Sequence, residues 1–160
     1  KNKSSKVFLI PIVSFFIYYI FIFLSLTPYH YTYLNSFNGD YSKAYKKFEN
    51  DYWAVSLKEL INQISLRENL LNKKEVKIAF CGVAFNNVDT YFKKINNFNF
   101  QKVNYLNESF DYIIMTNRTV YEEDSKLLNA KTCFDRFSGS DIITVKRNGL
   151  VLSTMRKIIK

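Results

Sequence analysis

Residues 7–26 read VFLIPIVSFFIYYIFIFLSL, a run of twenty residues without a charged side chain. As a helix, this run would be roughly 30 Å long, which matches the hydrocarbon core of a bilayer. A cleaved signal sequence usually has a shorter apolar region that ends in small residues. A helix that is apolar on every face is also hard to cover in a soluble chain of 160 residues. The run therefore predicts a membrane span, with Pro11 in its first turn.

The charges around this span predict its orientation. Lys1, Lys3 and Lys6 precede the span, so the positive-inside rule places the N-terminal flank in the cytoplasm and the rest of the chain outside it. Residues 27–160 are also basic, but long translocated segments largely escape that rule. The net charge of +9 accompanies an excess of Lys, Asn, Phe and Tyr that is typical of AT-rich genomes. We therefore expect no nucleic-acid partner.

The segment that follows the span is rich in tyrosine. Tyr29, Tyr31 and Tyr33 alternate where the lipid headgroups would lie, and tyrosine suits that level because its ring is apolar and its hydroxyl is polar. One interpretation is an aromatic anchor, and the other is the border of a site for a lipid-linked or polar substrate. His30 is the only histidine, and no Cys, Asp or Glu stands near it at ligand spacing, so we expect no metal site.

The remainder of the chain has a mixed α/β pattern. Ser56 and Glu59 predict a capping box, in which the serine oxygen accepts from the amide three residues on, followed by apolar residues at helical spacing. Helices are predicted over residues 41–48, 57–71, 88–95 and 121–128, and strands over residues 76–81, 100–106, 111–116 and 131–137. Helices between strands favour parallel pairing, and the strand over residues 111–116 is apolar enough to be central.

The C-terminal end predicts a hairpin. Residues 141–147 and 150–156 flank Asn148-Gly149, the pair that suits a type I′ turn because both central residues need positive φ. The predicted fold is an N-terminal transmembrane helix followed by a small extracytoplasmic α/β sandwich with a mixed sheet. The segments are a cytoplasmic flank (1–6), the span (7–26), an interfacial aromatic connector (27–47) and a soluble α/β domain (48–160).

Chemical motifs are few. Neither a glycine-rich dinucleotide fingerprint nor a phosphate-binding loop is present, so we expect no nucleotide cofactor. Cys81 and Cys133 could form a disulfide outside the cytoplasm, or they could be buried thiols, the commoner state for strand cysteines. Glu49 and Asp51 could be paired carboxylates for glycosyl chemistry, or polar connectors that lead to Ser56. The acidic residues 122–124 are typical of a helix start.

Two sequence motifs suggest a family. Residues 28–35 read PYHYTYLN and residues 48–59 read FENDYWAVSLKE, after a hydrophobic span and a glycine. These stretches, together with CFDRF at residues 133–137 and Arg147-Asn148-Gly149, resemble the C-terminal end of bacterial membrane glycosyltransferases of the protein mannosyltransferase and aminoarabinose transferase superfamily. His30, Leu34 and Ala54 depart from the residues common in that family, where Gln, Phe and Gly stand.

The resemblance implies an enzyme of the bacterial inner membrane. Such an enzyme moves a sugar from a polyprenyl-phosphate carrier to an extracytoplasmic acceptor, and its catalytic carboxylate lies in a loop after the first span, upstream of this sequence. No catalytic residue is therefore expected here, and the bilayer and the lipid-linked sugar are the expected partners. The candidates for the rim of the site, or for docking of the soluble domain, are Tyr31, Tyr33, Asn35, Asp51 and Trp53. The alternative is a single-span protein with an extracytoplasmic α/β binding module.

Overall fold

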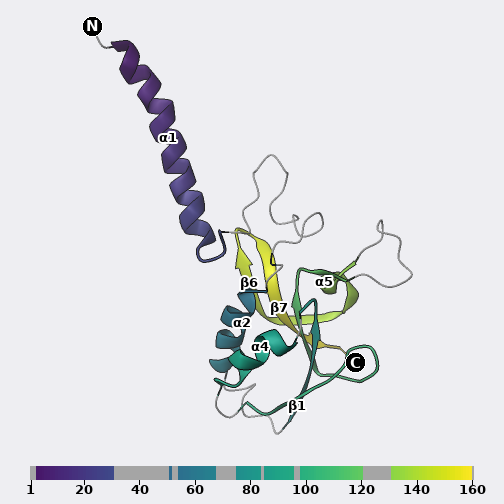
Figure 1. The fold of residues 1–160 in the computed structure, drawn as a ribbon. Helices are drawn as coiled ribbons and strands as arrows, with labels where there is room; N and C mark the ends of the chain where they lie inside the picture. The colour runs from purple at the N-terminus through teal and green to yellow at the C-terminus, as the bar shows by residue number, and fades with distance from the viewer. Residues whose placement is uncertain are drawn as a thin grey trace. The chain divides into compact units, whose positions relative to one another are not determined.

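The computed structural model describes residues 3–30, 51, 54–67, 75–83, 85–95, 98–120 and 131–159 of the chain. These residues belong to two compact units, Lys1–Tyr33 and Leu34–Lys160. Among the described residues, the first unit contains the long helix α1, and the second contains the sheet and the shorter helices (Figure 1).

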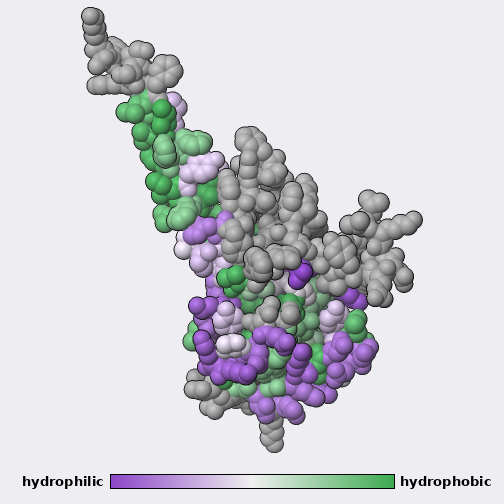
Figure 2. Space-filling view, in the orientation of Figure 1, coloured by the Kyte–Doolittle hydropathy of each residue, from purple (hydrophilic) through white to green (hydrophobic). Residues whose placement is uncertain are grey.

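Helix α1 (Lys3–Leu26) confirms the long apolar helix that the sequence predicts. Its segment Leu9–Leu26 has a mean hydropathy of 2.4 and is long and apolar enough to cross a membrane. Apolar side chains follow one another along the described part of the helix (Figure 2), with Phe21 69% exposed. The helix begins at Lys3, so Pro11 lies inside it and not in its first turn, which corrects the prediction. A proline at an interior position removes one backbone hydrogen bond.

The second unit is built on a five-stranded mixed sheet with the order β2-β1-β3-β7-β6. Strand β1 pairs in parallel with β2 and β3, whereas β7 pairs antiparallel with β3 and β6. The strands are β1 (Val76–Cys81), β2 (Phe100–Lys102), β3 (Tyr112–Thr116), β6 (Gly139–Arg147) and β7 (Leu150–Ile158). A separate two-stranded sheet joins β4 (Thr119–Val120) to β5 (Lys131–Thr132), and the described helices of this unit are α2 (Ser56–Ser65), α4 (Phe85–Phe92) and α5 (Cys133–Arg136). Parallel pairing of the early strands and antiparallel pairing at the end are both confirmed.

Strand β3 lies in the middle of the sheet, as its apolar sequence predicts. All five of its residues are buried. Since side chains alternate between the faces of a strand, burial along the whole strand means that both faces of the sheet are covered.

Different helices cover the two faces of the sheet. Phe80 of β1 contacts Phe85 and Phe92 of α4, with ring centroids 5.1 and 5.9 Å away. Helix α2 packs beside α4 and against β6 and β7 (Figure 1). The next residue of β1, Cys81, points to the opposite face because side chains alternate, and there it is bonded to Cys133 of α5.

Several element ends differ from the prediction. The helix predicted over residues 57–71 ends at Ser65, the helix predicted over residues 88–95 begins at Phe85 and ends at Phe92, and the strand predicted over residues 100–106 ends at Lys102. Leu66, the first residue after α2, is 80% exposed, so this apolar residue adds nothing to the buried face of the helix. Packing of an apolar face supplies most of the stability of a helix in a protein. The helices predicted over residues 41–48 and 121–128 lie outside the described residues.

The strand predicted over residues 131–137 is wrong beyond Thr132. Residues Cys133–Arg136 form the short helix α5. Thr132 precedes this helix, and its hydroxyl donates to the carboxylate of Asp135, 2.7 Å away. A threonine followed three residues later by an acidic residue is a helix-start pattern, and the sequence contains it. The alternation of apolar residues in this stretch favoured a strand, but the bond between the Thr132 and Asp135 side chains spans the first turn of the helix, although Thr132 makes no side-chain bond to a helix amide.

The C-terminal hairpin is confirmed. Strands β6 and β7 pair up to Arg147 and Leu150, and Asn148 and Gly149 between them have φ values of 48° and 80°. Both values are positive, as a type I′ turn requires. Ile143 and Val145 of β6 are buried, so one face of the hairpin belongs to the core.

We expect Gly149→Val to destabilise the second unit. A β-branched residue at a φ of 80° adopts a strained conformation that costs on the order of 1 kcal/mol or more. For a domain of this size, about 1 kcal/mol lowers Tm by about 4 °C, which thermal unfolding of residues 34–160 followed by circular dichroism can measure. Asn148→Gly is the matched control, because glycine adopts positive φ without strain. Equal melting temperatures for the valine variant and the parent protein would contradict the turn.

Candidate functional site

The carboxylate of Asp51 is buried at the start of helix α2. Asp51 is only 1% exposed. Its Oδ1 accepts from the Val55 amide at 2.9 Å, and its Oδ2 accepts from the Ser56 amide at 3.2 Å and from the Ser56 hydroxyl. A negative group is stabilised at this end of a helix, where amide donors are unpaired. Asp51 therefore caps α2 from outside the helix.

The predicted capping box of Ser56 and Glu59 is wrong. The hydroxyl of Ser56 donates to Asp51, and no side chain of the box caps the helix. An aspartate carboxylate carries a full charge and two acceptor oxygens, so it competes successfully with a serine hydroxyl for the same amide donors. The pattern that marks the helix start is correct, but the residue that caps the helix lies five positions earlier than Ser56.

Asn117 links the start of α2 to the sheet. Asn117 directly follows β3, and its amide donates to the carbonyl of Leu152 at 3.2 Å. Its Oδ1 accepts from the Asp51 amide at 3.2 Å. Within the described part of the chain, Nδ2 of Asn117 and the hydroxyl of Ser153 are buried polar atoms without a hydrogen-bond partner. Asn117 was not among the residues predicted for the site, although its position directly after a buried strand is one where polar site residues are often found.

Glu59 forms an ion pair with Arg147 at the end of the hairpin. The guanidinium donates to both carboxylate oxygens, with Nη2 2.7 Å from Oε2 and Nη1 3.5 Å from Oε1. The two side chains are 31% and 21% exposed, so water screens the pair only in part. The pair joins α2 to β6, and it connects the two sequence motifs that contain Glu59 and Arg147.

We expect Glu59 and Arg147 to be energetically coupled. A double-mutant cycle with Glu59→Ala and Arg147→Ala should give a coupling free energy of about 0.5–1 kcal/mol, since the pair is bidentate but partly hydrated. Denaturant unfolding of the four proteins measures this energy. Lys93 and Asp89, of which the lysine side chain is 74% exposed, form the control pair, and their coupling should be smaller. Strictly additive effects at Glu59 and Arg147 would argue against the contact.

A disulfide lies at the carboxyl end of β1. Cys81 and Cys133 are bonded, with Cα atoms 5.9 Å apart, and both residues are buried. The interpretation of these cysteines as free buried thiols is therefore wrong. Gly82 follows with a φ of 77°, and a Cβ there would lie 2.7 Å from Oγ1 of Thr116 and 3.1 Å from Sγ of Cys133. Only glycine fits next to the disulfide in this conformation.

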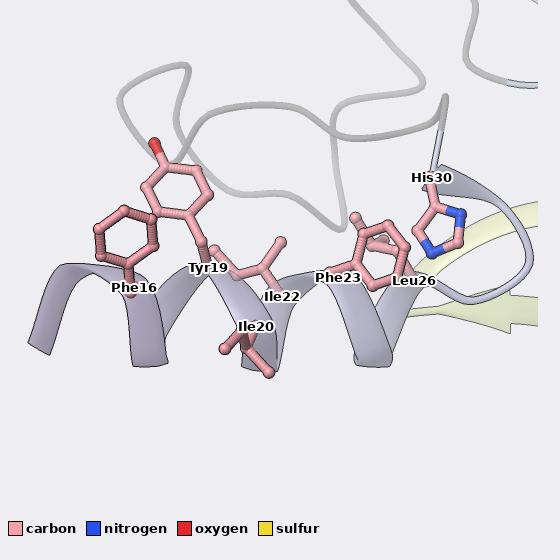
Figure 3. A pocket seen from close by; sticks show the side chains of 7 residues that line it. All are labelled: Phe16, Tyr19, Ile20, Ile22, Phe23, Leu26 and His30. Atoms are coloured by element: carbon pink, nitrogen blue, oxygen red, sulfur yellow. The ribbon is translucent and has the colours of Figure 1, made fainter. Parts of the chain in front are cut away.

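The first unit has an apolar groove along α1, with a volume of about 400 Å³. Figure 3 shows the described side chains that line it: Phe16, Tyr19, Ile20, Ile22, Phe23, Leu26 and His30. The imidazole of His30 stacks on the ring of Phe23 at a centroid distance of 3.9 Å, and its Nε2 lies 3.1 Å from the hydroxyl of Thr27. Such a lining suits hydrocarbon. In the part of the chain that the structure describes, no cluster of His, Cys, Asp or Glu could hold a metal ion.

The structure describes one of the five residues that the sequence predicts for the site. Asp51 is buried in the helix cap, so its carboxylate does not face solvent. Tyr31, Tyr33, Asn35 and Trp53 lie outside the described residues, as does Glu49, the proposed partner carboxylate of Asp51. Of the stretches that resemble the family, residues 48–59 supply Asp51 and Ser56, which are bonded to each other at the start of α2, and Glu59, which is paired with Arg147 of the stretch 147–149.

Comparisons of this chain with protein-family models, with curated proteins and with solved structures found no match.

Proposed function

We propose that this chain is the C-terminal part of a multi-spanning glycosyltransferase of the bacterial inner membrane. The enzyme transfers a sugar from a polyprenyl-phosphate carrier to an acceptor outside the cytoplasm. In this proposal α1 is one span, residues 48–160 form an extracytoplasmic α/β sandwich, and the catalytic carboxylate belongs to an upstream loop. The chain itself holds no catalytic residue and requires no cofactor.

One observation carries the proposal: two of the stretches that resemble the family, far apart in the sequence, are joined by the ion pair between Glu59 and Arg147. Asp51, Ser56 and Glu59 come from the motif before and within α2, and Arg147 belongs to the motif at the hairpin. If the two stretches matched the family only by chance, contact between their residues in the fold would not be expected. The contact between these stretches supports the interpretation that they belong to one domain, as they would in the family that the chain resembles.

The disulfide supports the extracytoplasmic placement of the second unit. Cys81 and Cys133 are bonded and buried, and structural disulfides persist in oxidising compartments such as the bacterial periplasm. Lys1, Lys3 and Lys6 favour a cytoplasmic position for the other end of α1. In this arrangement the second unit and the proposed sugar transfer are both on the extracytoplasmic side of the membrane.

We expect residues 27–160 to be accessible from outside the cytoplasmic membrane. Protease added to intact spheroplasts that contain the full-length protein should digest this part of the chain, as an antibody against the C-terminus would detect. A cytoplasmic marker protein must survive the same treatment. Protection of the C-terminus until the spheroplasts are lysed would contradict this topology.

Deletion of the gene tests the proposed activity. A strain that lacks the protein should accumulate one polyprenyl-phosphate sugar and lose the same sugar from an envelope glycoconjugate, both measured by mass spectrometry. The full-length gene should restore both. Unchanged lipids and glycans in the deletion strain would exclude the transferase and leave the single-span binding module as the favoured function. The observation that favours a single-span binding module is that the second unit is compact and contains its own disulfide bond.

A further inference from the structure

The second unit has a pocket of about 400 Å³ at the carboxyl ends of β1 and β2. Phe80, the residue before Cys81 in β1, is 8% exposed and forms part of its lining. Val83 and Phe85 line it from the chain after β1, and Val103 from the chain after β2. Ligands of parallel sheets bind at the carboxyl ends of the strands, and this volume lies within the usual range for small-molecule sites.

Polar side chains occupy the other part of the lining. They are Lys102, Asn104, Tyr105 and Glu108. The ammonium of Lys102 lies 4.5 Å from the ring centroid of Phe85, so its position is restricted by a cation–π contact. Oε1 of Glu108 accepts from the Asn104 amide at 2.9 Å. This donor is the backbone amide of Asn104, so the loop after β2 holds the Glu108 carboxylate beside the Asn104 backbone. Oδ1 of the Asn104 side chain accepts from the Leu106 amide at 3.0 Å, so the group of this side chain that can donate to a ligand is its NH2.

The chemistry of this lining selects the class of ligand. One ammonium and one carboxylate balance each other, so the lining does not favour a ligand with a large net charge. The lining also contains both donors and acceptors, which hydroxyl groups satisfy because each can donate and accept. The apolar residues around Phe80 and Val103 need a ligand with an apolar face.

We propose that this pocket binds one neutral pyranose unit of a glycan. The C–H face of the ring packs against the apolar wall, and the hydroxyl groups donate to the Glu108 carboxylate and accept from Lys102 and Asn104. The site binds a saccharide without breaking or forming a covalent bond. It does not rest on the proposed transferase activity, because its described lining includes no residue of the two motifs and no residue of α1.

Methyl NMR of the full chain tests this site. The protein is labelled with ¹³C at valine methyl groups, held in micelles of a detergent without a sugar headgroup, and titrated with the methyl glycosides of glucose, galactose and mannose. At least one glycoside should shift the methyl signals of Val83 and Val103 saturably. The signal of Val145, which is buried in the hairpin, should not move.

Two variants locate the binding site. Lys102→Ala removes an exposed side chain, and Glu108→Gln keeps an oxygen that can accept from the Asn104 amide, so neither change should affect folding. Each should raise the Kd about 3–10-fold, the loss expected for one hydrogen bond. Lys146→Ala, an exposed lysine of β6, is the matched control and should leave the Kd unchanged.

Three results would overturn the proposal. The first is no saturable shift with any of the glycosides, and the second is a Kd that both variants leave unchanged. The third is a stronger response to sodium phosphate or sodium acetate than to the glycosides, which would indicate a site for anions. These outcomes are independent of the lipid and glycan changes in a deletion strain, so failure of this site and failure of the transferase are distinguishable.

Discussion

Replacement of Cys81 and Cys133 by alanine is expected to lower the free energy of unfolding of the second unit by about 2–4 kcal/mol. The bond closes a loop with a sequence separation of 52 residues, and the loop-closure entropy of such a loop corresponds to about 4 kcal/mol. The bond also ties α5 to the end of β1 in the core. Tm should therefore fall by roughly 8–16 °C, since about 1 kcal/mol corresponds to about 4 °C for a unit of this size.

Differential scanning calorimetry of residues 34–160, with and without a phosphine reductant, measures this effect. The reductant should lower the Tm of the parent protein and leave the double alanine variant unchanged, which separates bond cleavage from other effects of the reductant. Alkylation followed by mass spectrometry must show that both thiols are free in the reduced sample. An unchanged Tm with both thiols free would show that the bond contributes nothing to stability.

Asp51→Ala is expected to cost roughly 3 kcal/mol of unfolding free energy. The change removes the acceptor of two amide groups and one hydroxyl at the buried start of α2. Loss of a helix cap alone costs about 0.5–2 kcal/mol, and each buried donor without an acceptor adds about 1–3 kcal/mol unless water reaches it. Urea unfolding of residues 34–160 gives the free energy directly.

Two matched variants separate the contributions of the Asp51 cluster. Asp51→Asn keeps one acceptor oxygen in place, so its loss should be smaller than that of alanine. Ser56→Ala removes only the hydroxyl donor and should cost least of the three. Lys58→Ala, an exposed position on the same helix, controls for changes in helix propensity. If Asp51→Ala and Lys58→Ala unfold at the same urea concentration, the carboxylate does not stabilise the start of α2.

Elements with strong local signals were predicted from the sequence. The strand over residues 76–81 has the predicted bounds, and the strand over residues 111–116 differs by one residue. Asn148-Gly149 predicts its turn because the φ requirement of a type I′ turn acts on the two residues themselves. Where the signal depends on packing, prediction was poorer: α2 ends at Ser65, the apolar residue Leu66 that follows is 80% exposed, and no Gly or Pro within the helix marks that point.

The candidate site was predicted only in part, since its contacts join distant segments. Asp51 was selected for a site rim, but in the structure its carboxylate caps α2. Glu59 was assigned to a capping box, whereas its partner is Arg147, 88 residues further along the chain. A local pattern identifies residues that can accept or donate. It does not identify which of several possible partners forms the hydrogen bond or ion pair in the folded chain.

The sequence by itself determined the long apolar helix, the mixed α/β character of the remainder and the C-terminal hairpin. Each follows from residues that are neighbours along the chain, through hydrophobic periodicity, strand propensity or allowed φ. Only the tertiary structure decided that Cys81 pairs with Cys133, that Asp51 caps α2, and that Lys102 and Glu108 share a pocket. These contacts depend on the strand order β2-β1-β3-β7-β6. That order is set by the burial of all the elements together, and no single stretch of sequence encodes it.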